Sequence, residues 1–240
     1  MTRTRRATIA MLLVGLAIFS SLYSTQAILP TLVQNMGLSS TEAAMTVSAA
    51  TGALALCVVP ASILSERFGR GRILLISAVS ATSVGLIVPL AAEGWHLILL
   101  RGLQGALLSG APATAMAWLS EELYDKALPR AMGLYIAGTS VGGLTGRLIP
   151  TGLVEISTWR WALFGSALVS LAFAITSWLL LPAQRNFRPK SIHLTSETRA
   201  LFGHWANRDL ALLFLTAFLS MGTFVSMYNF LTFRLIDDFG

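Results

Sequence analysis

The chain has 240 residues, of which 55% are hydrophobic and only 12% are charged, about half the charged share of a soluble domain. The formal net charge is +6, but the basic residues stand in short gaps between apolar runs and do not cluster with aromatic residues, which argues against nucleic-acid binding. A single cysteine excludes a disulfide within the chain and a cysteine-rich metal site. The composition therefore indicates an integral membrane protein, because a bilayer accommodates apolar surface that a soluble chain of this length could not bury.

Seven apolar windows of 20 to 25 residues follow one another along the chain. Each is long enough to cross about 30 Å of hydrocarbon as a helix, at about 1.5 Å per residue. We therefore predict an all-α transmembrane fold with seven membrane-spanning helices. The windows are Ala7–Leu29, Ala43–Leu64, Ile73–Ala92, Trp95–Leu119, Ala131–Val154, Trp161–Leu181 and Leu210–Phe233.

The basic residues are distributed unequally between the two sides of this topology. Thirteen of the 17 fall on the side of the N-terminus, while the opposite loops hold only Arg160 and Arg234. The positive-inside rule then predicts a cytoplasmic N-terminus and a cytoplasmic loop after the sixth window. The thirteen are Arg3, Arg5, Arg6, Arg67, Arg70, Arg72, Lys126, Arg130, Arg185, Arg188, Lys190, Arg199 and Arg208.

The long polar stretch after the sixth window divides the chain. We predict a six-helix transmembrane bundle over residues 1–181, a central cytoplasmic loop over 182–209 and the start of a second bundle over 210–240. A weak internal repeat supports this division: a shift of 203 positions places Leu32–Gly37 on Leu235–Gly240 and Gln26 on Asn229. Parallel repeats of this kind are one of the architectures of transporters.

The turn between the second and third windows, Ser62–Arg72, combines one acid with three bases. Gly69 permits a tight reversal there. Glu66, Arg67, Arg70 and Arg72 fit either of two interpretations: a charged latch between bundles, or an ordinary turn with basic anchors on the cytoplasmic side.

Two arginines lie inside predicted membrane-spanning helices. Arg101 and Gln104 are three residues apart on one face of the fourth helix, and Arg147 lies toward the outer end of the fifth. A charge at such a depth faces protein, water or an anion, or extends to the headgroups. Because the seven windows contain no Asp or Glu, we expect carbonyls, polar side chains, a bound anion or a group outside this chain to be the partners.

The fifth helix carries Gly138, Gly142 and Gly146 at intervals of four residues, with Gly143 beside them. A stripe of small residues lets another helix backbone come close, either as fixed packing or as a sliding surface.

Polar residues gather in the first helix, where Tyr23 and Gln26 share one face, and in the seventh, which carries Asn229 at the equivalent depth. Such clusters either join neighbouring helices or line a cavity, and the matching positions favour a lining.

Three of these segments resemble signatures of the major facilitator superfamily. Ser62–Arg72 is similar to the family's loop between helices 2 and 3, with Ser62 in place of a glycine and Glu66 in place of an aspartate. The Arg101, Gln104 and Gly105 segment resembles the helix 4 signature, whose arginine is implicated in proton coupling or substrate contact. Gly138–Arg147 resembles the helix 5 signature of the drug/proton antiporters, with Gly143 in place of the proline and Arg147 in place of the last glycine.

The resemblance implies a secondary transporter of small organic solutes in a bacterial inner (plasma) membrane, with proton-coupled export. It implies a cytoplasmic gate at Glu66, Arg67, Gly69, Arg70 and Arg72, and a substrate or proton pathway at Tyr23, Gln26, Arg101, Gln104, Arg147 and Asn229. It also implies a helix-packing seam at Gly138, Gly142, Gly143 and Gly146.

A full member of that family has twelve helices, so we expect this chain to be truncated from such a fold and to need a second bundle or an oligomer partner. The alternatives are an inactive fragment of such a transporter and a membrane protein with a non-transport role. No cofactor, metal, nucleic acid or enzymatic activity is expected. The expected partners are the lipid bilayer, the small-molecule solute and protons.

Overall fold

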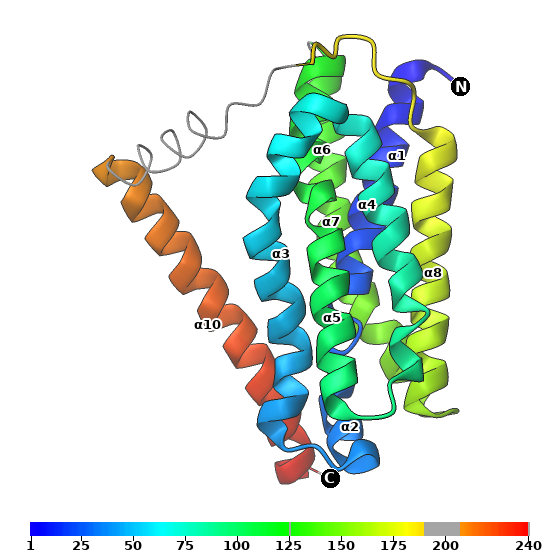
Figure 1. Cartoon of the computed structure of the whole chain (residues 1–240), viewed down its shortest axis with the longest axis vertical. Helices are drawn as coiled ribbons and strands as arrows, with labels where there is room; N and C mark the ends of the chain where they lie inside the picture. Colours follow the sequence, from blue (N-terminus) through cyan, green and yellow to red (C-terminus); the bar gives the residue numbers. More distant parts are fainter. Residues whose placement is uncertain (125, 190–206, 240) are drawn as a thin grey trace. The chain divides into compact units, whose positions relative to one another are not determined.

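The computed structural model describes residues 1–124, 126–189 and 207–239, and the regular structure in these residues is helical (Figure 1). The chain forms two units, Met1–Pro189 and Lys190–Gly240, each of which is described by itself. Lys190, Arg199 and Gly240 lie outside the described residues. The elements are α1 (Arg3–Leu22), η1 (Gln26–Ile28), α2 (Leu29–Met36), α3 (Ser40–Phe68), α4 (Arg70–Gly85), η2 (Val88–Leu90), α5 (Gly94–Leu108), α6 (Gly110–Glu122), α7 (Ala127–Val154), α8 (Trp159–Leu180) and α10 (Arg208–Phe239).

Each predicted window coincides with helical segments, which confirms the all-α transmembrane fold. Among the described helices, five stretches are long and apolar enough to cross a membrane: Arg3–Met36, Ser40–Phe68, Arg70–Leu90, Trp159–Leu180 and Arg208–Leu231. The fifth window, in α7, is less apolar because of its glycines and Arg147. The fourth window is divided between α5 and α6, which have 15 and 13 residues.

Three windows that we expected to be continuous helices are interrupted: the first, the third, in which α4 ends at Gly85 and η2 follows from Val88, and the fourth. The fourth breaks at Ser109, three residues before Pro112, because a proline ring clashes with the carbonyl four residues earlier and lacks an N–H. Ser77 of α4 spans this break: its hydroxyl accepts a hydrogen bond from the Ala111 N–H at 3.1 Å and donates one to the Leu107 carbonyl. These two bonds to Ser77 therefore supply partners for two backbone groups at the break.

The first window breaks after Leu22, where α1 gives way to a turn and then to η1. The Ser24 hydroxyl donates to the Ser21 carbonyl at 3.0 Å, a local bond that competes with helix continuation. Pro30 then stands within the first turn of α2, where its missing N–H is tolerated.

Small residues fill the interior of Met1–Pro189, and large apolar side chains cover its surface. Ala10, Ala17, Ala78 and Ala111 are fully buried, whereas many leucines, tryptophans and isoleucines are exposed. This distribution suits a bilayer, since lipid tails cover the large apolar side chains while small residues let helices approach closely.

The glycine stripe of α7 packs directly against the backbone of α1. A Cβ atom on Gly142 would lie 2.8 Å from the Gly15 carbonyl oxygen, and one on Gly146 would lie 2.5 Å from the Ser20 carbonyl oxygen. A Cβ on Gly138 would collide with the Leu12 carbonyl. The stripe is therefore a seam of backbone contact within one unit.

We predict that Gly146→Ala lowers the stability of the chain, because the added methyl overpacks a backbone contact at a cost of about 1–3 kcal/mol, more than the helix propensity that alanine gains. Gly133→Ala is the matched control on the same helix, since a Cβ there meets nothing within 4 Å. Thermal unfolding in detergent measures both variants. Equal midpoints for the two would show that α1 and α7 have room to separate.

Candidate functional site

Arg101 of α5, one of the predicted pathway residues, is completely buried. Its guanidinium donates to the Ser21 carbonyl at 3.0 Å and to the Leu22 carbonyl, both at the end of α1. Its Nε donates to the Thr46 carbonyl of α3 at 3.3 Å. The end of a helix presents unpaired carbonyls and a partial negative charge, so the cation stabilises α1 where α1 stops.

Gln104 holds Arg101 in place and extends the network to α4. Its side-chain oxygen accepts a bond from Arg101 at 2.5 Å. Its amide nitrogen donates to the Ser21 hydroxyl at 2.7 Å and to the Ala81 carbonyl at 3.2 Å. The predicted pairing of Arg101 and Gln104 on one helix face is therefore present, and carbonyls and a polar side chain are the partners of the arginine.

Arg147 of α7 joins the segment just beyond the break in α1. Its Nε donates to the Gln26 side-chain oxygen at 2.9 Å, and another guanidinium nitrogen donates to the Gly143 carbonyl at 2.7 Å. The guanidinium carbon stands 4.3 Å from the centre of the Tyr23 ring, a cation–π distance. The structure thus brings Tyr23, Gln26 and Arg147 together around one turn of chain.

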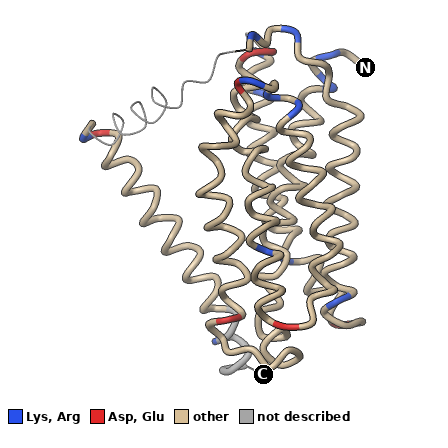
Figure 2. Tube along the Cα trace, in the orientation of Figure 1, with Lys and Arg blue, Asp and Glu red and all other residues tan. Residues whose placement is uncertain are grey.

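The residues of the predicted gate lie at the end of Met1–Pro189 that carries the N-terminus, where basic residues gather (Figure 2). Gly69 has a φ of +100° and joins α3 to α4 by a sharp turn. Arg70 pairs with Glu121 of α6 at 2.5 Å and with Glu66 at 3.5 Å. Arg67 and Arg72, by contrast, are exposed. Arg67 forms no ion pair among the described residues and lies over the Phe68 ring at 5.4 Å.

Two acids that the sequence reading missed organise this end. Besides Arg70, Glu121 accepts a bond from Gln184, at 2.9 Å. The Glu122 side chain is 1% exposed and pairs with Arg3 at 2.5 Å. It also accepts bonds from the backbone N–H groups of Arg185 and Asn186.

A usable signal for these acids was present in the sequence. Glu121 and Glu122 are adjacent, follow the fourth window directly and stand on the side that carries most of the bases. An acid pair on the side that carries most of the bases is a natural ion-pair partner, but we assigned charge pairing only within Ser62–Arg72.

The remaining predicted residues are the four glycines of α7 and Asn229 of α10. Gly138, Gly142 and Gly146 form the seam against α1 described above. Gly143 instead faces the Tyr23 ring, and a Cβ there would meet it at an ordinary distance of 3.6 Å. Asn229 lies on α10, in the second unit.

The chain is similar to known proteins along almost its whole length. The model of the Major Facilitator Superfamily matches residues 11–240. The inner membrane transport protein YnfM of Escherichia coli is 37% identical over 232 residues, covering 96% of this chain and 55% of YnfM. A gallate transporter of Pseudomonas putida is 28% identical over 160 residues, covering 67% of this chain and 36% of that protein.

Solved structures show the same fold. A bacterial homologue of the human lysosomal transporter Spinster, in an inward-facing and unoccupied conformation, superposes with a TM-score of 0.76 at 17% identity. The superposition covers 98% of this chain and 56% of that structure. This chain therefore spans about half the length of the relatives it matches, and it belongs to the Major Facilitator Superfamily.

Proposed function

We propose that Met1–Pro189 contributes one bundle of a secondary active transporter that exports small organic solutes in exchange for protons. The observation that carries this proposal is the interrupted first helix, whose two ends are held by Arg101 and Arg147. Discontinuous helices whose exposed backbone groups meet charged partners recur at the binding sites of secondary transporters. A purely structural bundle would have no need to place two guanidinium groups, one of them fully buried, at a helix break inside the membrane, since charges at such depth are costly.

The substrate class follows from family membership and from the relatives. The gallate transporter acts, by its name, on a small organic anion. Because this chain covers about half of YnfM, the other wall of the pathway is proposed to come from outside Met1–Pro189. Arg147, which is only half-buried, is our candidate for the solute-facing residue, and Tyr23 and Gln26, which are buried, are candidates for positioning its guanidinium. Arg101 and Gln104 are candidates for the proton pathway.

The gate proposal separates the roles of two arginines. Arg70 already pairs with Glu66 and Glu121, so it holds α3, α4 and α6 together within the unit. Arg67 and Arg72 are both exposed and form no ion pair among the described residues, so both are able to pair with another bundle, and we propose Arg67, in the last turn of α3 beside Glu66, as the latch. A latch needs to shift a conformational balance by only about 1–3 kcal/mol.

A second candidate is a membrane protein without transport activity. The self-contained packing of α1 against α7 and the closed ion-pair network at Glu121 and Glu122 favour it, because both features stabilise the unit without a partner. The reconstitution experiment below separates the two candidates.

The proposed orientation places the basic end in the cytoplasm. With the native Cys57 replaced by alanine, a cysteine at Ser39 should react with an impermeant thiol reagent added outside intact cells, and a cysteine at Thr4 should not. Both positions are exposed and lie at opposite ends of the unit. The opposite labelling pattern would reverse the topology and remove the gate from the cytoplasm.

Arg101→Ala should lower the free energy of unfolding by about 3 kcal/mol, because it leaves the carbonyls of Ser21, Leu22 and Thr46 without their buried donor. Arg72→Ala is the control, since this exposed side chain forms no ion pair among the described residues and a surface change stays within about 0.5 kcal/mol. Reversible denaturation in detergent gives both values. Similar losses of unfolding free energy in Arg101→Ala and Arg72→Ala would mean that Arg101 does not stabilise the break in α1.

The transport proposal is tested by reconstitution. The monomeric chain in proteoliposomes should give no saturable solute flux, because one bundle supplies one wall of a pathway. Flux of gallate or another small organic anion should appear when the C-terminal half of YnfM is produced together with it, and a protonophore should abolish that flux. Saturable flux from the monomer would contradict the requirement for a second wall. Absence of flux in the presence of the second half, with assembly verified by co-purification, would favour the non-transporting candidate.

The same assay tests the gate. Arg67→Ala should abolish flux in the assembled carrier and leave the unfolding midpoint unchanged. Arg5→Ala, which changes an exposed base of α1 outside the predicted gate, should retain flux. Full solute flux in Arg67→Ala would mean that Arg67 only anchors the turn at the membrane surface and is not a latch.

A further inference from the structure

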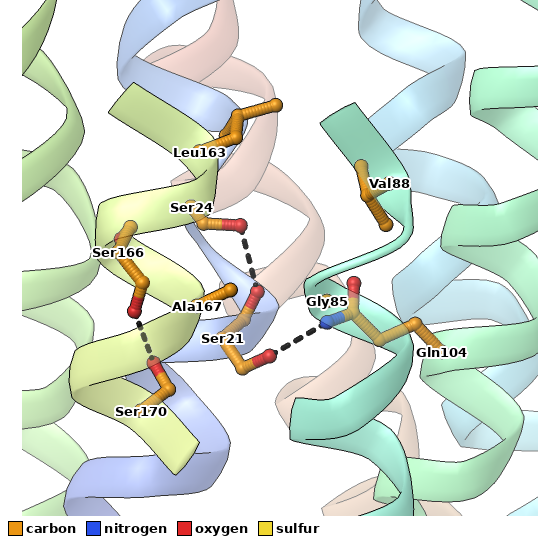
Figure 3. A pocket seen from close by; sticks show the side chains of 9 residues that line it. All are labelled: Ser21, Ser24, Gly85, Val88, Gln104, Leu163, Ser166, Ala167 and Ser170. Atoms are coloured by element: carbon orange, nitrogen blue, oxygen red, sulfur yellow. Dashed lines mark hydrogen bonds between the residues drawn. The ribbon is translucent and has the colours of Figure 1, made fainter. Parts of the chain in front are cut away.

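A small polar cavity lies inside Met1–Pro189, between α1, α4, η2, α5 and α8 (Figure 3). It offers room of about 10 Å³ for the centre of a water molecule, which corresponds to about one water. No organic solute fits a space of that size. Its lining consists of Ser21, Ser24, Gly85, Val88, Gln104, Leu163, Ser166, Ala167 and Ser170.

The Ser166 hydroxyl is the feature of this cavity that calls for a ligand. Ser166 is completely buried, and its Oγ has no hydrogen-bond partner among the described residues. An unsatisfied buried hydroxyl costs about 1–3 kcal/mol, and nearly all such groups in proteins are bonded to protein or to ordered water. Serine hydroxyls inside helices usually bond the carbonyl three or four residues back, as Ser170 does to Ser166 at 3.0 Å. Ser166 makes no such bond.

Three other lining hydroxyls retain hydrogen-bonding capacity toward the cavity. Ser21 Oγ accepts from Gln104, which leaves its own O–H free to donate. Ser24 and Ser170 donate to carbonyls, which leaves their oxygens as acceptors. The Ser166 hydroxyl can both donate and accept a hydrogen bond. The cavity therefore supplies the two to four hydrogen-bond partners that a buried water needs.

We propose that this cavity is a site for one ordered water molecule, which bridges Ser166 of α8 to the serines at the end of α1. The site stands where two helices stop together, since Ser21 is next to the last residue of α1 and Gly85 is the last residue of α4. The water links α8 to the hydrogen-bond network of Gln104 and Arg101. The water thereby supplies hydrogen bonds at the point where α1 stops and where a continuous helix would have made backbone hydrogen bonds of its own.

The charge of the surroundings selects water over a metal cation. Gln104, which lines the cavity, also accepts a bond from the buried guanidinium of Arg101 at 2.5 Å. That guanidinium has no carboxylate partner among the described residues, and its positive charge disfavours a second cation nearby. Hydroxyl groups also donate hydrogen bonds to chloride, and the ion-replacement experiment below distinguishes a bound chloride from a bound water.

X-ray radiolysis footprinting tests the site directly, because hydroxyl radicals formed from a bound water modify the side chains that touch it. In the purified chain, Leu163, which lines the cavity and is 3% exposed, should be modified several-fold more than Leu108, which is 0% exposed and lies elsewhere in the interior. Equal modification of the two leucines would overturn the proposal. Ser166→Val fills the space with methyl groups and should reduce modification of Leu163 to the level of Leu108. Unchanged modification in that variant would mean that bulk solvent reaches Leu163, which also overturns the proposal.

The direction of a stability change provides a second test. If a water satisfies Ser166, Ser166→Ala loses a hydrogen bond and lowers the unfolding midpoint. If the hydroxyl is unsatisfied, the same change removes a penalty and raises the midpoint. Ser177→Ala is the matched control on α8, because the buried Ser177 hydroxyl bonds within its own helix to Ala174. A rise of the unfolding midpoint in Ser166→Ala would overturn the proposal. So would a fall of the midpoint no larger than the fall in Ser177→Ala.

Replacing sodium chloride by choline gluconate separates water from an ion. The midpoint of the unmodified chain should stay the same in the two salts. A fall in choline gluconate that is absent from Ser166→Val would assign the site to sodium or chloride instead.

Discussion

The buried guanidinium of Arg101 is the interaction on which this half of the fold depends. A membrane offers no water to the carbonyls of a helix that stops in its interior, and it offers none to a buried cation. At the end of α1 these two costs offset one another, because the carbonyls of Ser21 and Leu22 accept from Arg101. Neither the break nor the charge would be stable alone. Just beyond this break, Gln26 accepts a bond from Arg147 of α7, so a second guanidinium holds the other side of the interruption.

The packing of the unit suggests how such a bundle would move. The glycines of α7 bring its backbone against that of α1, and a Cβ on Gly105 of α5 would collide with the Ala50 backbone of α3. Interfaces of this kind leave little freedom for a helix to slide within the unit. Motion is then expected to occur at the surfaces of the bundle, as rocking of one rigid body against another, the form of alternating access common in transporters. The close backbone contacts favour the fixed-packing interpretation of the glycine stripe over the sliding one.

The sequence predicted the helices well, because twenty apolar residues in a row have few structures other than a membrane-spanning helix. It did not predict the interruptions. Pro112 was a visible signal for the break at Ser109, but the break in α1 has no proline at its start and depends on Arg101, a residue of another helix. For the same reason the sequence placed Arg101 and Gln104 on one face but could not say which carbonyls they meet. Glu121 and Glu122 are visible in the sequence as an acid pair on the basic side, but their partners Arg3, Arg70 and Gln184 are distant in sequence and are brought to them only by the fold.

The carboxylate of Glu122 has a consequence for biosynthesis. Its partners are Arg3 near the start of the chain and the backbone of Arg185 and Asn186, which the ribosome makes far later. Arg3 also donates to the Ala183 carbonyl, 180 residues away. This end of the bundle therefore cannot close until α8 has been translated and inserted. Until then Glu122 lacks the backbone donors of Arg185 and Asn186, although its partner Arg3 has already been made. The order of synthesis thus allows the N-terminal segment to be fastened in two stages, first to α6 through the ion pair and later to the segment after α8 through the Ala183 carbonyl.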